Sequence, residues 1–429
     1  MTDPSKVQIC SISNRHRWSI VGLLFVASMI NYMDRATLSI SLPLVSKELG
    51  LGPASKGILL SAFFWSYALM QVPIGLCADR MNLRWLYAGA FTLWSVAQGL
   101  TGFSGSLKIL IILRILLGIG ESIYLPGGTK IVSLLFSSKE RGLPSGLFDM
   151  GTRTGLVLDG ILIPWLIAKY GWRQMFMIVG FTALIWLIPW LLVYPKRLHE
   201  GKTSPQRHTT GIAESNHAAG AVGGVKRSGL SITMNRNLLG ICLGFFCFDY
   251  YWYLLVTWLP DYLVTVRGLT ILTAGLYASL PYFVFGISEP IGGWIADRLI
   301  RFGWDETRTR KGVVTFAFMT GLLLLPAVRV SSAGAAVILI IGGSLVGLAT
   351  GNLLVILQSC APPREIGAWT GMENFVGNLA GIIAPIATGF LIQHTGSYAP
   401  GFALAVFVLL AGLGSYWFIV GNLGSPQHD

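Results

Sequence analysis

The sequence predicts an all-α integral membrane protein with twelve transmembrane helices arranged as two six-helix bundles. Of its 429 residues, 53% are hydrophobic and 12% are charged, and the mean hydropathy is +0.64. This composition excludes a water-soluble globule. Apolar stretches of about 20 residues, the length that crosses about 30 Å of hydrocarbon, recur along the chain. Lipid offers the backbone no hydrogen-bond partners, so these stretches must be helical.

The predicted spans fall into two groups of six. In the first half they lie at residues 18–42, 57–78, 85–104, 108–136, 142–168 and 174–194, and in the second half at 238–259, 273–296, 313–330, 334–358, 367–392 and 401–421. The segment between them is polar and rich in Gly, Ser, His and Lys, so it cannot bury a core and is predicted to be a cytoplasmic linker. The expected units are therefore an N-terminal bundle at 1–195, a linker at 196–236 and a C-terminal bundle at 237–429.

The net charge of +12 reflects topology rather than a nucleic-acid partner. About 20 of the 31 Lys and Arg residues fall in segments that are cytoplasmic if both termini are inside, which fits the positive-inside rule. We therefore expect a multi-pass protein of a cell membrane, a bacterial inner membrane, with both termini in the cytoplasm. The first hydrophobic run is too long for a signal-peptide core and lacks a cleavage site, so it is expected to remain as the first helix.

The five cysteines lie mostly in apolar runs without the spacing of metal ligands. Core packing accounts for them, so we expect no disulfide framework, no metal site and no cofactor. The sequence also contains no catalytic motif in a fitting context, which argues against an enzyme.

An internal repeat relates the two halves. Gly75-Leu-Cys-Ala-Asp79-Arg80 follows the second span, and Gly293-Trp-Ile-Ala-Asp297-Arg298 follows the eighth. Glycine allows two helix ends to approach closely, and an Asp-Arg pair at the membrane edge can bond neighbouring helix termini. The recurrence at corresponding positions supports the division into two bundles.

This loop resembles the signature of the major facilitator superfamily, and the resemblance extends from Trp18 to about Val420. It implies the major facilitator fold, with two pseudo-symmetric bundles that rock about a central site. Asn82 stands where the family usually has glycine. The loops are implied to hold a cytoplasmic gate shut in the outward-facing state, with Gly75, Asp79, Arg80, Arg84, Gly293, Asp297 and Arg298 as its residues.

Several charged residues lie within predicted spans, where insertion of each at mid-bilayer costs about 2.5–3.5 kcal/mol of free energy. Asp34 and Arg35 are in the first span, and Arg114 and Glu121 are in the fourth. Arg114 and Glu121 are seven residues apart, so they share a helix face with about 10 Å of rise between them. Each is then free to exchange partners with Asp34 and Arg35, which would couple proton binding to conformation. A buried ion network that only fixes helix packing is the alternative.

The same segments resemble the anion:cation symporter branch, which carries hexuronates, aldonates and glucarate. The matching segments are Asn31 to Arg35, Arg114 to Glu121, Tyr250 to Leu263 and Asn374 to Pro385. The resemblance implies proton symport, with Asp34 and Glu121 protonated and Arg35 and Arg114 as their switching partners. It also places Tyr67 and Asn374 at the sugar-acid site, and the planar fork of Arg35 suits a substrate carboxylate.

The fifth span departs from these carriers, which tend to have a glutamine near this chain's Thr152 and Arg153. Asp149 and Arg153 have i, i+4 spacing and could neutralise each other. Alternatively, Arg153 faces the cavity as a second cation for the substrate, with Thr152 beside it. Asp249, Glu289 and Glu373 are further cavity candidates that could equally pair locally.

Small residues four apart recur at Gly151 and Gly155 and at Gly377 and Gly381. Such spacing lets helices pack closely. We expect these contacts at the interface between the two halves.

The leading prediction is proton-coupled import of a small organic anion, most plausibly a sugar acid, by a monomer in the lipid bilayer. The alternative is an antiporter that exchanges organic phosphate for inorganic phosphate. Such an antiporter binds its substrate through an arginine in each half. The seventh span, Leu238 to Trp258, contains no arginine. A membrane-bound enzyme or a transport-like sensor is a third possibility, but no soluble domain is long enough to signal.

Overall fold

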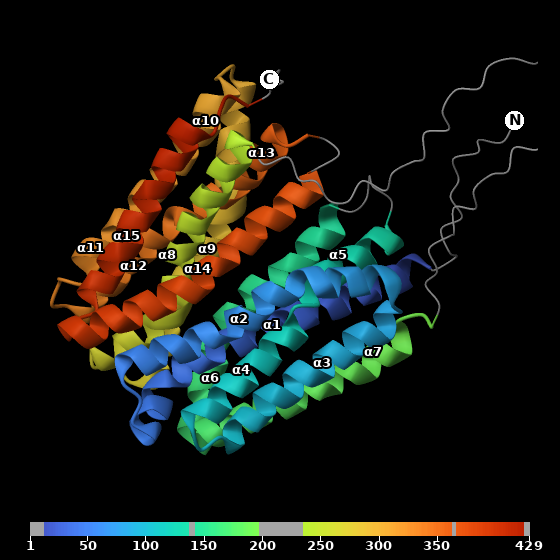
Figure 1. Cartoon of the computed structure of the whole chain (residues 1–429), viewed down its shortest axis with the longest axis vertical. Coiled ribbons are helices and arrows are strands. Elements are labelled where there is room, and N and C mark those ends of the chain that lie inside the picture. The colour runs from blue at the N-terminus through green and yellow to red at the C-terminus, as the bar shows by residue number, and fades with distance from the viewer. Residues whose placement is uncertain (1–12, 137–141, 197–234, 363–365, 424–429) are drawn as a thin grey trace, which may run out of the picture.

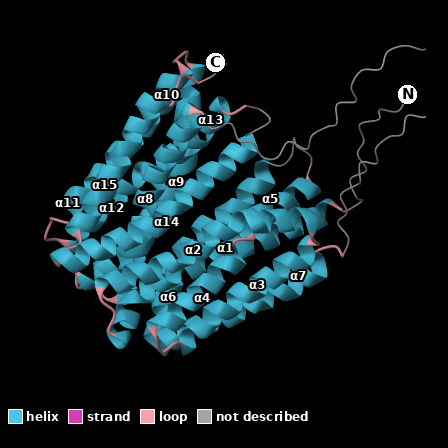
Figure 2. Ribbon diagram, viewed as in Figure 1, coloured by secondary structure: helices cyan, strands magenta, loops and turns pink. Residues whose placement is uncertain are grey.

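The computed structural model describes residues 13–136, 142–196, 235–362 and 366–423. Within these ranges all regular secondary structure is helical (Figure 2). The predicted linker, apart from its ends, lies outside the described residues. The C-terminal half begins at Arg236, where the Asn235 side chain accepts a hydrogen bond from the Leu238 amide and caps the helix.

The helices of the first half correspond to the six predicted spans. They are α1 (Asn14–Leu49), α2 (Pro53–Arg80), α3 (Leu83–Leu100) with the short helix η1 (Thr101–Phe103), α4 (Leu107–Glu121), α5 (Tyr124–Leu135), α6 (Gly142–Ala183), η2 (Leu184–Trp186) and α7 (Leu187–Val193).

The second half repeats this pattern. Its helices are α8 (Arg236–Thr265), α9 (Ile271–Arg301), α10 (Glu306–Thr320), η3 (Gly321–Leu323), α11 (Leu324–Ala327), α12 (Ala333–Gly343), η4 (Ser344–Ala349), α13 (Thr350–Cys360), α14 (Ile366–Thr395), α15 (Ala399–Gly414) and the π-helical turn η5 (Ser415–Ile419).

The helices form two bundles, α1–α7 and α8–α15, which converge at one end and diverge toward the other (Figure 1). Both the start of α1 and the end of η5 lie at the diverging end. Eight helical runs in the described residues are long and apolar enough to cross a membrane, and one of them, Pro144–Val193, is 50 residues long. The predicted fold class is confirmed.

The fourth span, predicted as one helix, is interrupted between α4 and α5 directly after Glu121. Pro126 has no backbone N–H, so the carbonyl of Ser122 loses its helical partner at this point. Helical bonding resumes where the Gly127 amide donates to the Ile123 carbonyl. The interruption places Glu121 at a helix end inside the bundle.

The fifth and sixth spans are separated by a turn at Gly171, whose φ of 80° is left-handed. The turn is held to the end of α1, because Arg173 and the Trp172 indole donate hydrogen bonds to the Glu48 carboxylate. Glu48 lies beyond the membrane-spanning part of α1. Its pKa is lowered mainly by the hydrogen bond from Arg173 and also by the one from Trp172. The turn therefore stays anchored over the whole physiological pH range.

The two bundles meet along α2 and α14, α6 and α9, and α1 and α8. At the converging end the backbones nearly touch, because a Cβ on Gly57 would overlap the Pro385 carbonyl oxygen. An ion pair closes this end, with Lys56 Nζ 3.0 Å from an Asp261 carboxylate oxygen. The Tyr398 hydroxyl donates to the same carboxylate.

Gly151 and Gly155 on α6 do not lie at the interface between the halves, contrary to expectation. A Cβ on Gly151 would meet the Phe25 carbonyl, and one on Gly155 would meet the Met29 carbonyl, both on α1. Gly377 faces Phe245 of α8 within the C-terminal half, whereas Gly381 does face Phe64 across the interface. Spacing alone indicates a close contact but not which neighbouring helix makes it.

Candidate functional site

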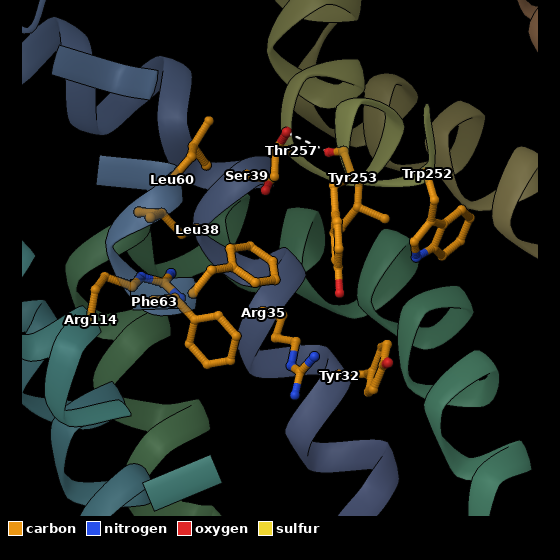
Figure 3. Close-up of a pocket in the computed structure, with 12 residues that line it drawn as sticks. Tyr32, Arg35, Leu38, Ser39, Leu60, Phe63, Arg114, Trp252, Tyr253 and Thr257 are labelled. Carbon is orange, nitrogen blue, oxygen red and sulfur yellow. Dashed lines mark hydrogen bonds between the residues drawn. The ribbon is translucent and has the colours of Figure 1, made fainter. Parts of the chain in front are cut away.

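A small pocket lies between the bundles, at the meeting of α1, α2, α4 and α8. Figure 3 shows Tyr32 and Arg35 on α1 and Trp252 and Tyr253 on α8 around it. The space open to the centre of a water molecule is about 20 Å³, enough for one water and too little for a sugar acid. Binding of such a substrate therefore requires the two bundles to move apart here.

Arg35 is one of two arginines that line this pocket, the other being Arg114. Its Nε donates to Oε2 of Glu121 at 2.9 Å, and its guanidinium lies 4.4 Å from the ring centre of Tyr67 and 4.5 Å from that of Tyr32. Phe63 adds a third ring at 4.8 Å. Nη2 has no hydrogen-bond partner. The aromatic rings hold the guanidinium plane in place while leaving one donor group available.

Asp34 and Glu121, together with Arg114 from the pocket lining, complete a buried cluster beside the pocket. Asp34 and Glu121 are fully buried and Arg114 is 3% exposed. Arg114 donates to the backbone carbonyl of Asp34 at 3.2 Å, while its Nε and Nη2 have no partner. Neither carboxylate oxygen of Asp34 has a partner, nor does Oε1 of Glu121. The structure thus brings the four predicted coupling residues together with several donor and acceptor groups unused.

Glycines on α4 allow this assembly. A Cβ on Gly118 would overlap the Phe63 carbonyl and the Ser66 hydroxyl of α2, and one on Gly120 would lie 2.8 Å from Trp94 of α3. Only glycine permits so close an approach. The helix can therefore carry Glu121 to the guanidinium of Arg35.

The other predicted substrate contacts lie around the pocket rather than in its lining. Tyr67 stacks on Phe63, with ring centres 5.2 Å apart. Asn374 accepts a hydrogen bond from Asn378, which in turn accepts one from the Tyr253 hydroxyl at 3.1 Å. Asn374 therefore reaches the pocket only through two other side chains.

Asp149 and Arg153 do not neutralise each other, so that interpretation of their i, i+4 spacing was wrong. Arg153 forms an ion pair with Glu289 of α9, across the interface between the halves. Asp149 instead accepts a hydrogen bond from the Tyr124 hydroxyl at 3.0 Å. The Thr152 hydroxyl is used within α6, where it donates to the Asp149 carbonyl. Arg153 also lies 5.4 Å from the ring of Trp252, which lines the pocket.

The predicted gate residues lie near the diverging ends of the bundles. Asp297 is bound by Arg310 at 3.0 Å, and a guanidinium nitrogen of Arg84 donates to the Leu191 carbonyl. Arg80 is exposed, and Arg298 lies near the rings of Trp294 and Phe302. The side chain of Asp79 lies outside the described part of the chain. Gly75 and Gly293 stand where an added Cβ would meet little or nothing.

Some residues at the site were missed in the sequence. Trp252 and Tyr253 line the pocket from α8, and Asp159 on α6 is fully buried beside α1. Asp159 carries the signal that identified the other charges, since it interrupts the apolar run from Gly155 to Ile163. Asp249 and Glu373, which were predicted as candidates, are both buried in the C-terminal half.

Comparison with known proteins agrees with this architecture. Residues 24–385 match the family model of the Major Facilitator Superfamily. A probable galactarate/D-glucarate transporter of Bacillus subtilis (strain 168) is 31% identical over 95% of this chain and 92% of its own length. A D-galactonate transporter of Escherichia coli O6:H1 is 29% identical, covering 95% of this chain and 96% of its own.

Among solved structures, a bacterial homologue of the human lysosomal transporter Spinster, in an inward-facing and unoccupied conformation, superposes with a TM-score of 0.78. It is 18% identical and covers 95% of this chain and 98% of that one, which supports the fold alone. The family match, the full-length relatives and the two-bundle fold lead to one conclusion. The chain belongs to the Major Facilitator Superfamily and is a membrane transporter rather than an enzyme.

Proposed function

We propose that the protein is a proton-coupled symporter of a small organic anion, and that its substrate is a sugar acid of the aldonate, hexuronate or aldarate class. The names of the galactarate/D-glucarate and D-galactonate transporters support the substrate class. The observation that carries the mechanism is the position of Arg35 in the pocket lining. Its Nε binds Glu121, and its Nη2 has no hydrogen-bond partner among the described residues.

A substrate carboxylate would compete with Glu121 for Arg35. Binding of the anion through both guanidinium edges leaves Glu121 without its cation in a fully buried position. An ionised carboxylate without a partner in a buried site has a high free energy. Glu121 therefore takes up a proton as the substrate binds. Asp34, whose carboxylate oxygens have no partner, provides a second proton site beside Arg114.

Alternating access would open and close the two ends of the molecule in turn. With both termini in the cytoplasm, the diverging end faces inward and the Lys56–Asp261 end faces outward. The structure then corresponds to an inward-facing state of a monomer in a bacterial inner membrane. In the outward-facing state, the loops that include Asp79, Arg80, Asp297 and Arg298 would close the cytoplasmic end.

Protons are needed because the inside-negative potential opposes an incoming anion by about 2.3 kcal/mol per charge per 100 mV. One proton with a monoanion gives an electroneutral step. Use of both Asp34 and Glu121 would make uptake of a monoanion electrogenic and still inward.

Asp34→Asn tests the coupling in liposomes that contain the purified protein. Ligands are first found by thermal stabilisation with D-galactonate, D-glucarate, D-glucuronate and glycerol 3-phosphate, since binding stabilises the folded state. Wild-type protein should accumulate the active compound when the outside is made acidic. Asp34→Asn should lose this accumulation but keep exchange of labelled for unlabelled substrate, because exchange requires no net proton movement.

Glu121→Gln provides the second test of coupling. It should shift or flatten the pH dependence of uptake, because a glutamine cannot bind and release the proton that follows substrate binding. Accumulation at the wild-type level in both variants would contradict the proposed coupling. Stabilisation by glycerol 3-phosphate alone, together with exchange for inorganic phosphate, would favour the antiporter instead.

A further inference from the structure

A third buried carboxyl group adjoins the cluster of Asp34, Arg35, Arg114 and Glu121. Asp159 lies on α6, the helix that packs most extensively against α1, and it is fully buried. Its Oδ1 is 3.2 Å from the Thr37 hydroxyl, and its Oδ2 has no hydrogen-bond partner. Asp159 is within electrostatic range of both Asp34 and Arg114.

The contact with Thr37 indicates where a proton lies. A hydroxyl carries one proton and can donate only one strong hydrogen bond. Thr37 Oγ1 is 2.7 Å from the Met33 carbonyl, which can only accept, and 3.2 Å from Oδ1 of Asp159. The shorter contact takes the hydroxyl proton. The bond to Asp159 is then completed when the carboxyl is protonated and donates to Thr37.

Counting charges independently indicates that the cluster holds one proton, and the Thr37 contact assigns that proton to Asp159. The cluster contains three carboxyl groups, Asp34, Glu121 and Asp159, but two guanidinium groups, Arg35 and Arg114. Arg35 is paired with Glu121, which leaves Arg114 facing two aspartates. An uncompensated charge in a fully buried site is costly, so the cluster is neutral only when it holds one proton.

Within the described ranges, the surroundings of Asp159 supply no further cation. Of the titratable groups on the helices packed around it, Asp34, Arg114 and Tyr282 of α9 are within electrostatic range in the described part of the chain. The Tyr282 hydroxyl donates to the Leu255 carbonyl at 3.2 Å and is therefore not available to the carboxylate. Among the residues that the structure describes, Arg114, with two unused donor groups, is the one cation that can reach a deprotonated Asp159.

We infer that Asp159 is a third proton-binding carboxyl of the coupling cluster and holds its proton in the conformation seen here. This inference rests on the proposed proton symport and extends it. When Asp159 releases its proton to Asp34 or to water, Arg114 moves its free donor groups to the new carboxylate. Asp159 and Asp34 therefore compete for one guanidinium, and only one of them is ionised at a time.

Infrared difference spectra between alkaline and acidic pH test this on the full chain in liposomes, without substrate. The wild type should show absorption from a protonated buried carboxylic acid. Asp159→Asn should lose the component that Asp159 contributes, because two carboxylates of the cluster then balance two guanidinium groups. Any component from the buried Asp249 and Glu373 should remain. Asp149→Asn is the matched control from the same helix and should retain the absorption, since Asp149 is exposed and accepts the Tyr124 hydrogen bond.

Asparagine offers the same donor and acceptor as a protonated carboxyl, so Asp159→Asn should fold with the wild-type arrangement around Thr37. Thr37→Val provides a second variant if it does not. Removal of the hydroxyl takes away the acceptor of the Asp159 proton and should shift the carboxylic-acid band to higher frequency. A band that is absent from the wild type, or unchanged in both variants, would overturn the inference.

A transport measurement separates this inference from the proposed function. Asp159→Asn should lose accumulation driven by a pH gradient while retaining exchange. If none of the tested sugar acids is transported by the wild type, the proposed substrate class fails but the infrared result still stands. If the wild type accumulates a sugar acid and Asp159→Asn does so equally, Asp159 is not part of the coupling.

Discussion

Arg35 shows how a single residue can serve two partners. Three aromatic rings surround its guanidinium, and the side chain of Glu121 engages its Nε. The rings supply attraction that does not depend on the carboxylate, so the guanidinium keeps its position when Glu121 is protonated. A substrate carboxylate then meets a cation that is already oriented.

Substitution of Arg35 should therefore weaken substrate binding. Arg35→Ala should abolish measurable binding of the sugar acid, since loss of one partner of a desolvated charge pair costs about 2–5 kcal/mol. Arg35→Lys should also bind at least about tenfold more weakly, because an ammonium lacks the planar fork that binds a carboxylate at two points. Calorimetric titration of the purified protein measures both effects.

Arg301→Lys, at the exposed end of α9, is the control and should bind as the wild type does. Unchanged affinity of Arg35→Ala would move the carboxylate site elsewhere, with Arg153 the next candidate.

A charge within an apolar run is the residue-level signal that the sequence offers. Asp34, Arg35, Arg114 and Glu121 stand out in this way, and the structure brings them together. The partner of Arg153 could not be predicted, because Asp149 lies at helical spacing and Glu289 is 136 residues away. Local spacing shows which pairs are able to form, and only tertiary packing decides between them.

At the scale of the helices, the turn at Gly171 fixes how the fifth and sixth spans follow one another. Gly171→Ala should lower stability by about 1–3 kcal/mol, the cost of a side chain at φ 80° and ψ 164°, a backbone conformation that is essentially restricted to glycine. The cost comes from the backbone angle and not from crowding, because an added Cβ would be 3.4 Å from its nearest neighbour, Gln174. Denaturant unfolding in detergent measures it.

Gly22→Ala on α1 is the matched control. It has open space and a helical backbone, so alanine there should be neutral or stabilising by up to about 1 kcal/mol. Equal loss of stability in the two variants would show that the φ angle of Gly171 is not the cause.

The crossing of α2 and α14 controls how closely the bundles meet. Gly57→Ala would place a methyl group against the Pro385 carbonyl, and overpacking of this kind costs about 1–3 kcal/mol. The closed state at this end should become less populated by roughly 5- to 150-fold relative to the open one. Distances between spin labels on the two bundles report this shift.

Gly52→Ala, directly before α2, should leave the distance distribution unchanged because nothing lies within 4 Å of its Cβ. A closed end in Gly57→Ala would mean that the helices can re-pack around the methyl group.

At the scale of the whole molecule, the Lys56–Asp261 pair joins the bundles at their converging end. Asp261 is fully buried and the Lys56 side chain is 12% exposed, so the pair is largely desolvated. Removal of one partner of such a pair costs about 3–5 kcal/mol. Alternating access requires the pair to separate in the opposite state, so its strength sets the balance between the two states.

Asp261→Asn and Lys56→Met should each shift the protein toward the state that is open at this end. The double variant Lys56→Asp with Asp261→Lys should recover part of the closed population, because it restores the attraction with reversed charges. Labelling of a cysteine introduced near this end by an impermeant thiol reagent measures the shift. Equal labelling of all three variants and the parent would show that the pair does not hold this end closed.

The sequence by itself determined the all-helical membrane fold and identified the charged residues that lie within apolar runs. These features are local, since hydrophobic length and the cost of a buried charge follow from composition along the chain. The tertiary structure decided which charges are partners, which end of the molecule is closed and that Asp159 joins the cluster. Those outcomes depend on contacts between helices distant in sequence, because a side chain's partner is set by the neighbouring helix against which it packs.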